Sequence, residues 1–317
     1  MELSLVIPLL NESESLEELC NWIIKELQKA ESPLNYEIIF IDDGSTDNSW
    51  EIISGLKKVH PKKVRGIRFL KNFGKSQAIH AGFKACTGAV VITMDADLQD
   101  HPSEILPLYK LITQKDYDLV SGWKKIRYDS VLLKNLPSKL FNAAARWTSG
   151  VKLHDFNCGI KAYKQIVVKS INVRGEMHRY IPVLAKNQGF YKITEKVVQH
   201  QARKYGTTKF GIERFINGFL DLITIWFLSK FGKRPMHFFG LLGVLVFFIG
   251  FCFSSYLGIE KLYLNPQSRL ITQRPEFYIA LTCIVLGIQF FLAGFIGEIY
   301  LRNKPEENLD YHIWEEI

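Results

Sequence analysis

Two long apolar segments without any Asp, Glu, Lys or Arg constrain the C-terminal third of this chain. They are PMHFFGLLGVLVFFIGFCFSSYLG, Pro235 to Gly258, and FYIALTCIVLGIQFFLAGFIG, Phe277 to Gly297. As helices, segments of this length span ~30 Å or more, which is the thickness of a bilayer core. A helix in the core of a soluble protein rarely lacks charge on every side for so many turns. We therefore predict two transmembrane helices within 235–301, at about 235–258 and 277–299.

Small residues in the two segments and basic residues beside them indicate how the predicted transmembrane helices pack and which way they are oriented. Glycine and alanine recur in both segments and would let the two helices pack closely. They include Gly240, Gly243, Gly250, Gly287, Ala293, Gly294 and Gly297. Basic residues flank both outer ends, and the positive-inside rule then predicts that the N-terminal region and the tail 302–317 face the cytosol. Neither segment carries the charges of a transport path, so we expect a multi-pass membrane anchor and no transport.

The stretch 211–234 precedes the first apolar segment and is amphipathic. Its apolar residues recur at helical spacing, namely Ile212, Phe215, Ile216, Phe219, Leu222, Ile223 and Trp226. This pattern indicates a juxtamembrane helix lying in the membrane interface. A docking helix of a soluble protein is the alternative.

The region 1–210 alternates apolar strand-like runs with helical stretches. Strands are predicted at 3–10, 36–42, 64–70, 89–95 and 117–123, and helices at 15–30, 47–59 and 75–86. The first four strands are almost continuously apolar, as in a parallel sheet covered on both faces. The predicted fold class is therefore α/β, a doubly wound domain with a mostly parallel sheet.

Polar residues follow each of the first four predicted strands. In doubly wound folds ligands bind beyond the carboxyl ends of the strands, so these residues indicate a binding site. They are Asn11, Glu12, Asp42, Asp43, Lys75, Asp95 and Asp97. The patterns GxxxxGK[ST] and GxGxxG are absent, which argues against a Walker ATPase and a Rossmann dehydrogenase.

Charge and cysteine content limit the partners and the chemistry. The formal charge is +8, which suits an anionic partner such as nucleic acid, acidic lipid or a phosphorylated substrate. The five cysteines form no CxxC pair, so neither a zinc site nor a disulfide framework is expected.

The stretch MDADLQD, residues 94–100, places several carboxylates directly after the fourth strand. If the chain stays extended there, Asp95 and Asp97 point to the same side. Their repulsion would be relieved by a divalent cation, and Mg²⁺ or Mn²⁺ prefers oxygen ligands shared with a substrate diphosphate. Asp100 is expected to cap the turn before His101-Pro102.

Four of these segments, VIPLLNESE, IDDGSTD, NFGKSQA and MDADLQD, together resemble the signatures of family 2 glycosyltransferases with the GT-A fold. More narrowly, the chain resembles the polyprenyl-phosphate glycosyltransferases, by motif over about 1–210 and by architecture beyond. The resemblance implies transfer of a hexose from a UDP- or GDP-linked donor to a polyprenyl (undecaprenyl or dolichyl) phosphate, with inversion. It implies Mg²⁺ or Mn²⁺ as cofactor. The implied partners are the donor, the lipid acceptor and the membrane, without nucleic acid, and a homo-oligomer is left open.

The resemblance also assigns roles to individual residues. Catalytic roles fall on Asp95, Asp97 and Asp155, and metal binding on Asp97 and Gln99. The nucleotide-sugar would contact Pro8, Asn11, Glu12, Asp42, Lys75, Asp95 and Gln99. The acceptor phosphate would contact Lys161, Arg203, Thr207 and Lys209. Because a phosphate monoester with a second pKa near ~6 is already mostly dianionic at neutral pH, we expect Asp155 to position the acceptor or a neighbouring cation rather than act as a base.

Two other functions are alternatives to glycosyl transfer to a polyprenyl phosphate. A processive polysaccharide synthase would carry a QxxRW motif, but in AAARW the glutamine position is Ala143, followed by Arg146 and Trp147. An inactive membrane protein that binds nucleotide sugars or anionic lipids would not need the intact Asp95, Asp97 and Asp155. The sequence leaves open the sugar, the nucleotide, the length of the lipid, the choice of metal and the oligomeric state.

Overall fold

The computed structural model describes residues 1–125, 142, 145–146, 149–175, 177–201, 204, 224, 227, 230–232, 234–267, 269–302 and 313–317. The chain forms two compact units. One consists of Met1–Ser229 together with Leu309–Ile317, and the other of Lys230–Asn308. The predicted juxtamembrane helix 211–234 lies largely outside the described residues.

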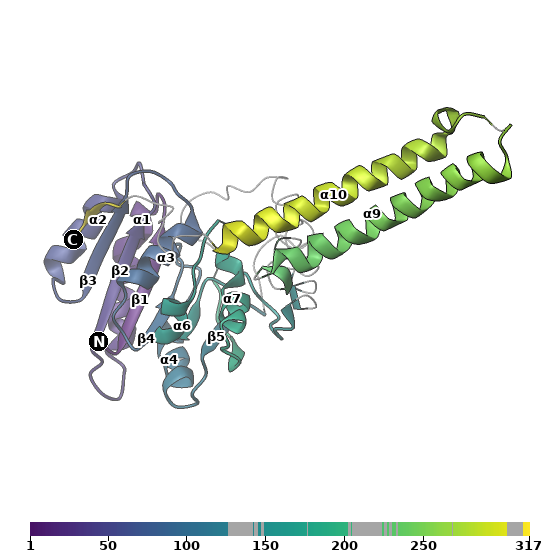
Figure 1. Ribbon diagram of the computed structural model, residues 1–317. Coiled ribbons are helices and arrows are strands. Elements are labelled where there is room, and N and C mark those ends of the chain that lie inside the picture. Colours follow the sequence, from purple (N-terminus) through teal and green to yellow (C-terminus); the bar gives the residue numbers. More distant parts are fainter. Residues whose placement is uncertain are drawn as a thin grey trace. The chain divides into compact units, whose positions relative to one another are not determined.

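The first unit is built on a mixed sheet (Figure 1). Its described strands follow the order β7-β5-β6-β4-β1-β2-β3-β8. The strands are β1 (Leu3–Leu9), β2 (Tyr36–Asp42), β3 (Val64–Phe69), β4 (Val90–Thr93), β5 (Leu119–Trp123), β6 (Lys161–Lys164), β7 (Ile193–Val197) and β8 (Ile313–Glu316). β1 pairs in parallel with β2 and β4, β2 with β3, and β5 with β7. β6 is antiparallel to β4 and β5, and β8 is antiparallel to β3.

All five strands predicted from the sequence are present, with ends that differ by up to two residues. The other three, β6, β7 and β8, are short and carry lysine or glutamate. Their sequences lack the apolar run that marks a strand, so pairing with neighbours decides their conformation. The parallel strands confirm the predicted α/β class, and the antiparallel ones make the sheet mixed.

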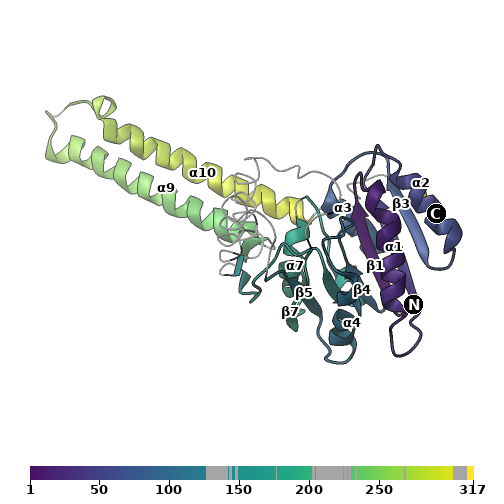
Figure 2. The same cartoon turned by 180° about the vertical axis from the view of Figure 1, so that it is seen from behind.

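Helices cover both faces of this sheet (Figure 2). Along the chain they are α1 (Ser13–Leu27), α2 (Ser49–Val59), α3 (Lys75–Ala85), η1 (Pro102–Glu104), α4 (Ile105–Thr113), α6 (Gln165–Ser170), η3 (Met177–Tyr180) and α7 (Ile181–Asn187). The three helices predicted from the sequence correspond to α1, α2 and α3.

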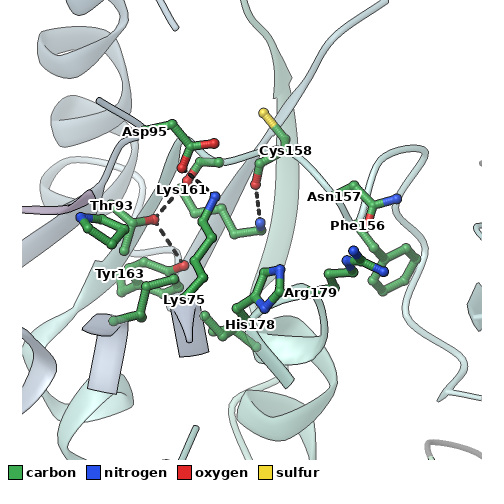
Figure 3. A pocket seen from close by; sticks show the side chains of 14 residues that line it. Lys75, Thr93, Asp95, Phe156, Asn157, Cys158, Lys161, Tyr163, His178 and Arg179 are labelled. Atoms are coloured by element: carbon green, nitrogen blue, oxygen red, sulfur yellow. Dashed lines mark hydrogen bonds and ion pairs between the residues drawn. The ribbon is translucent and has the colours of Figure 1, made fainter. Parts of the chain in front are cut away.

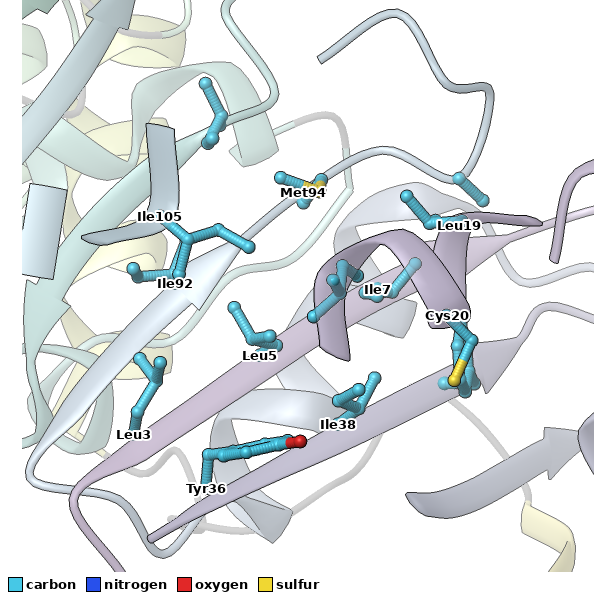
Figure 4. Packing of buried hydrophobic residues seen from close by; sticks show 14 of the residues in the cluster. Leu3, Leu5, Ile7, Leu19, Cys20, Tyr36, Ile38, Ile92, Met94 and Ile105 are labelled. Carbon is cyan, nitrogen blue, oxygen red and sulfur yellow. The ribbon is translucent and has the colours of Figure 1, made fainter. Parts of the chain in front are cut away.

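Alternate residues of β1 divide the core into two layers, because successive side chains of a strand point to opposite faces. Leu3, Leu5 and Ile7 pack in one cluster with α1, α2 and α4 (Figure 4). Val6 belongs to a second cluster formed with α3, α6 and α7. The sheet is therefore covered on both faces, as the apolar strands predict.

The second unit is a helical hairpin. It consists of α9 (Pro235–Ile259), a π-helical turn η4 (Glu260–Leu264), η5 (Ile271–Gln273) and α10 (Pro275–Arg302). Pro235–Leu264 and Pro275–Leu301 are long and apolar enough to cross a membrane, with mean hydropathies of 2.3 and 2.4 over an 18-residue window of each. Both helices expected from the sequence are thus present.

Small residues bring α9 and α10 into close contact. A Cβ atom added to Gly243 would lie 2.6 Å from the Gly287 carbonyl oxygen and 2.7 Å from the Phe291 nitrogen. A Cβ atom added to Gly250 would lie 2.6 Å from the Ala280 carbonyl oxygen. The helices therefore pack backbone to backbone, as small residues allow.

In the first unit, a buried ion pair joins the residue after β5 to the segment after β4. Lys124 Nζ lies 2.7 Å from Asp100 Oδ1, and the Asp100 side chain is fully buried. Burial alone would lower the pKa of Lys124, but neighbours that include Asp100 and Asp95 raise it above its usual value. The predicted turn-capping role of Asp100 is wrong, because its buried carboxylate faces Lys124 and accepts no backbone N–H among the described residues. The next turn, Pro102–Glu104, is capped by the His101 ring, which accepts the Ser103 N–H.

We predict that Gly243→Ala lowers the thermal stability of the hairpin, because the added methyl group must push α10 away. Overpacking of this kind typically costs about 1–3 kcal/mol. The matched control is Gly258→Ala, since a Cβ atom there meets nothing within 4 Å. Far-ultraviolet circular dichroism of the protein in detergent micelles would measure both melting temperatures. Equal melting temperatures for the two variants would contradict the predicted packing.

We also predict that Lys124→Met is strongly destabilising, because it leaves the Asp100 carboxylate buried without its cation. Breaking a buried pair in this way costs about 3–5 kcal/mol. The double variant Lys124→Met/Asp100→Leu should recover much of the loss, since no unpaired charge remains. Chemical denaturation of the three proteins measures the difference, and a double variant as unstable as the single one would refute the prediction.

Candidate active site

A pocket lies beyond the carboxyl ends of β1 and β4, where the sequence predicts a ligand site (Figure 3). Several elements contribute to its wall. The lining includes Pro8 of β1, Lys75 of α3, Asp95 after β4, the loop 156–159, Lys161 of β6, and His178 and Arg179 of η3. The predicted residues Pro8, Lys75, Asp95 and Lys161 are thus brought together by the fold.

An ion pair between Lys75 and Asp95 occupies one side of the pocket. Lys75 Nζ lies 2.6 Å from Asp95 Oδ1. Burial would raise the pKa of Asp95, but the positive charges of Lys75, Lys124 and Lys161 outweigh it and hold the pKa at about 2. Asp95 is therefore ionised at neutral pH and is poorly suited to donate a proton.

Lys161 is almost completely buried beside this pair. Its ammonium group donates to the Cys158 carbonyl oxygen, and burial lowers its pKa. Arg179 adds another positive side chain to the wall. Among the described lining residues, one acidic side chain, Asp95, stands against these cations, so the pocket favours an anionic ligand.

His178 and Arg179 are not predicted from the sequence. His178 Nδ1 lies 3.0 Å from Ser76 Oγ, and its backbone N–H donates to the same oxygen. Burial and the nearby Lys75 and Arg179 lower the pKa of His178 well below its usual value, so the imidazole is neutral. Two adjacent basic residues in EMHRY are the only local signal, and no motif spacing marks them.

Asn11, Glu12 and Asp42 lie at the carboxyl ends of β1 and β2, where hydrogen bonds join the two loops. Asn11 Oδ1 accepts the Thr46 N–H at 2.8 Å, and the Asn11 N–H donates to Ser45 Oγ at 2.9 Å. Asp42 Oδ1 accepts the Ser45 N–H at 2.8 Å. The Glu12 N–H donates to Ser49 Oγ. The predicted nucleotide residues therefore share one connected polar edge.

Asp43 fixes the loop that leads to Lys75. Its carboxylate accepts the Phe73 N–H at 2.7 Å and the Gly74 N–H at 2.9 Å. Burial raises the pKa of Asp43 to about 6 despite these hydrogen bonds. The residue after β2 thus determines where α3 begins, and α3 begins with Lys75.

The MDADLQD segment bends instead of continuing the strand. β4 ends at Thr93, and Leu98 has a φ of 59°. Asp97 Oδ1 accepts the Gln99 N–H at 3.2 Å. The predicted strand end at Asp95 is therefore wrong, because the chain leaves the strand after Thr93 and turns. Asp100, which follows this turn, forms the buried ion pair with Lys124. The metal-binding role of Asp97 and Gln99 remains a prediction.

Asp155 shapes the loop that lines the pocket. It is buried, and its Oδ1 accepts the Asn157 N–H at 3.0 Å. Phe156, Asn157 and Cys158, which follow it, all line the pocket. The remaining predicted acceptor residues, Arg203, Thr207 and Lys209, lie outside the described residues.

Arg146, the arginine of AAARW, serves the local fold. Its guanidinium donates to the Leu153 carbonyl oxygen at 3.1 Å. It is not among the described residues that line the pocket. This contact gives no support to the processive-synthase alternative.

Solved structures are similar in fold to most of this chain. Glucosyl-3-phosphoglycerate synthase from Mycobacterium tuberculosis, in complex with Mn²⁺, UDP and glucosyl-3-phosphoglycerate, superposes with a TM-score of 0.53 at 19% identity, covering 72% of this chain and 79% of that one. Its complex with Mg²⁺ and UDP gives a TM-score of 0.52 at 20% identity, covering 70% and 79%. These likenesses agree with the GT-A fold expected from the sequence.

Sequence comparisons extend over nearly the whole chain. The dodecaprenyl-phosphate galacturonate synthase of Rhizobium johnstonii is 33% identical over 306 residues, which cover 96% of this chain and 88% of the relative. The undecaprenyl-phosphate 4-deoxy-4-formamido-L-arabinose transferase of Shewanella sediminis is 35% identical over 310 residues, covering 95% and 89%. The family model described as glycosyl transferase family 2 matches residues 4–171. The chain therefore belongs to glycosyl transferase family 2.

Proposed function

We propose that this glycosyltransferase moves a sugar from a nucleotide-diphosphate donor to a polyprenyl phosphate at a membrane surface. The observation that carries the proposal is the cationic pocket at the carboxyl ends of β1 and β4, in a chain that also holds two helices apolar enough to span a bilayer. The relatives named for dodecaprenyl and undecaprenyl phosphate align over nearly the full chain, helices included, which supports a lipid acceptor.

The reaction joins two anions, so its main demand on the protein is positive charge. One acceptor phosphate oxygen forms a bond to the anomeric carbon, the bond from that carbon to the donor diphosphate breaks, and the nucleoside diphosphate leaves. Lys75 and Arg179 lie in the pocket wall, where they would stabilise the charge that develops on the diphosphate and the incoming phosphate. Lys161, buried beside them, fits the predicted contact with the acceptor phosphate.

Asp97 and Gln99 would hold a divalent cation. Their carboxylate and amide oxygens are ligands that Mg²⁺ and Mn²⁺ accept, and Mg²⁺ often uses one or two carboxylates together with substrate phosphates. No group of three or more His, Cys, Asp or Glu residues suited to a metal occurs in the described part of the chain. Two oxygen ligands from the protein fit a cation that binds together with the nucleotide-sugar, whose phosphates supply further ligands. When bound, the cation would neutralise charge on the departing diphosphate.

The connectivity of the chain supports the proposed membrane arrangement. β8, which comes after α10, joins the same sheet as β3. Both ends of the hairpin therefore connect to one domain, which supports our proposal that the hairpin crosses the bilayer twice and leaves domain and tail on one side. The basic flanks support the cytosolic side.

The proposed function is tested by incubating the purified full-length protein in detergent with undecaprenyl phosphate, Mn²⁺ and a panel of nucleotide sugars. The panel contains UDP-glucose, UDP-GlcNAc, UDP-galactose, GDP-mannose, and UDP-linked galacturonate and 4-deoxy-4-formamido-L-arabinose. We expect one monoglycosylated lipid by mass spectrometry. A lengthening saccharide would favour the synthase, and nucleotide binding without any product would favour the inactive binding protein.

We predict that Lys75→Met lowers kcat/KM by about 10²- to 10³-fold, the usual loss when one preorganised donor to a developing oxyanion is removed. The matched control is Lys71→Met, an exposed lysine in the loop before α3 whose ammonium group lies over the Phe73 ring. Its kcat/KM should stay within about twofold, as expected for a surface substitution. Steady-state kinetics compares the two, and equal losses would contradict a direct role for Lys75.

For Asp155 we predict a flat pH–rate profile between pH 7 and 9 in both wild type and Asp155→Asn, because a phosphate acceptor with a second pKa near ~6 needs no base. Asparagine can still accept the Asn157 N–H, so Asp155→Asn should retain more activity than Asp155→Ala. A large loss in Asp155→Asn that high pH restores would show that Asp155 is a general base.

A further inference from the structure

The C-terminal strand β8 pairs with β3, and β3 pairs with β2, the strand that ends at the predicted nucleotide residue Asp42. The last residues of the chain pair with β3, where Gly66 and Ile317 exchange two backbone hydrogen bonds of 3.0 Å. Arg68 and Glu315 lie opposite each other in the register. The final residues of the chain are thus integrated into the catalytic domain, on the edge that carries Arg68.

Trp50 of α2 connects β8 to the interior. Its ring lies over Gly66, where an added Cβ atom would be 3.1 Å from two ring carbons. Trp50 is 5% exposed, and its indole Nε1–H donates to Glu315 Oε2 at 3.0 Å. A buried indole N–H requires an acceptor, and here the acceptor comes from β8.

Arg68 links this tryptophan to Asp42. The guanidinium lies over the Trp50 ring, 5.8 Å from its centre, and Arg68 Nε is 3.6 Å from Asp42 Oδ2. Asp42 is fully buried at the end of β2, and its other oxygen accepts the Ser45 N–H. Ser45 Oγ in turn accepts the Asn11 N–H. A continuous path of contacts therefore runs from Glu315 to two predicted nucleotide residues.

We propose that β8 is a positioning element of the nucleotide subsite, acting through Glu315, Trp50 and Arg68 on Asp42. Glu315 fixes the indole, the indole supports the Arg68 guanidinium, and that guanidinium holds the buried Asp42 carboxylate in place. None of the three touches the reacting atoms, so their loss should weaken donor binding and leave the chemical step largely unchanged. The inference rests on the proposed function, because it takes Asp42 to contact the donor nucleotide.

The test compares Glu315→Ala with Glu316→Ala in the full-length protein. Glu316 belongs to the same strand and makes an ion pair of similar length, 3.0 Å, with Arg65. Arg65 is three residues from Arg68 along β3 and so faces the opposite side of the sheet. The two variants each remove one carboxylate from β8, but only Glu315→Ala interrupts the path to Asp42.

We expect Glu315→Ala to raise the donor KM and the Kd for a nucleoside diphosphate by about fivefold or more, as when a buried donor loses its acceptor. The change in kcat should be under about twofold, and Glu316→Ala should leave both constants within about twofold. Glu315→Gln should restore tight binding, because the amide oxygen still accepts the indole N–H. Trp50→Phe should weaken nucleoside diphosphate binding. The double variant with Glu315→Ala should bind little more weakly than either single variant, because both substitutions interrupt the same path.

Calorimetry with UDP and with GDP, each with Mn²⁺, measures the Kd, and melting temperatures report on the fold. Unchanged nucleotide binding in Glu315→Ala, or an equal loss in Glu316→Ala, would overturn the positioning role of β8. A lower kcat at constant KM would do the same. If the wild-type protein binds neither nucleotide, the proposed function fails, and this inference fails with it.

Discussion

The parallel pairing of β1 with β2 on one side and with β4 on the other is the constraint on which the rest of the structure depends. It brings the carboxyl ends of the strands to one edge of the sheet, and each end releases a polar loop there. The hydrogen bonds between these loops, such as Asn11 to Thr46 and Asp43 to Gly74, fix their positions relative to one another. Loops held in this way have less conformational entropy to lose when a substrate binds.

Charge then decides what this edge can bind. The pocket wall carries Lys75, Lys161 and Arg179 against Asp95, and burial keeps His178 neutral. Because cations outnumber carboxylates among the described lining residues, an anion in this pocket is electrostatically favoured. A reaction between a diphosphate and a phosphate monoester satisfies that requirement in both substrates. The same reasoning makes electrostatic stabilisation more important here than proton transfer.

The two units of the chain depend on different driving forces. The sheet domain buries apolar side chains between helices and strands, whereas α9 and α10 leave most of their apolar surface exposed and contact each other through glycine. Exposed apolar helices with backbone-close packing suit a lipid environment, in which burial of apolar side chains gives little advantage. After α10 the chain returns to the sheet as β8, so the segments before α9 and after α10 both belong to one domain.

The sequence by itself determined the strands β1 to β5, the helices α1, α2 and α3, the two apolar helices and the polar strand ends. These features arise from local periodicity and from runs of one residue type. Tertiary structure alone decided the short strands β6, β7 and β8, because sequences such as KAYK and IWEE become strands only when an existing edge offers hydrogen bonds. It also placed His178 and Arg179 beside Lys75, and turned Asp100 inward to Lys124. Such contacts join residues far apart in the chain, and local patterns hold no information about which distant charge a buried group will meet.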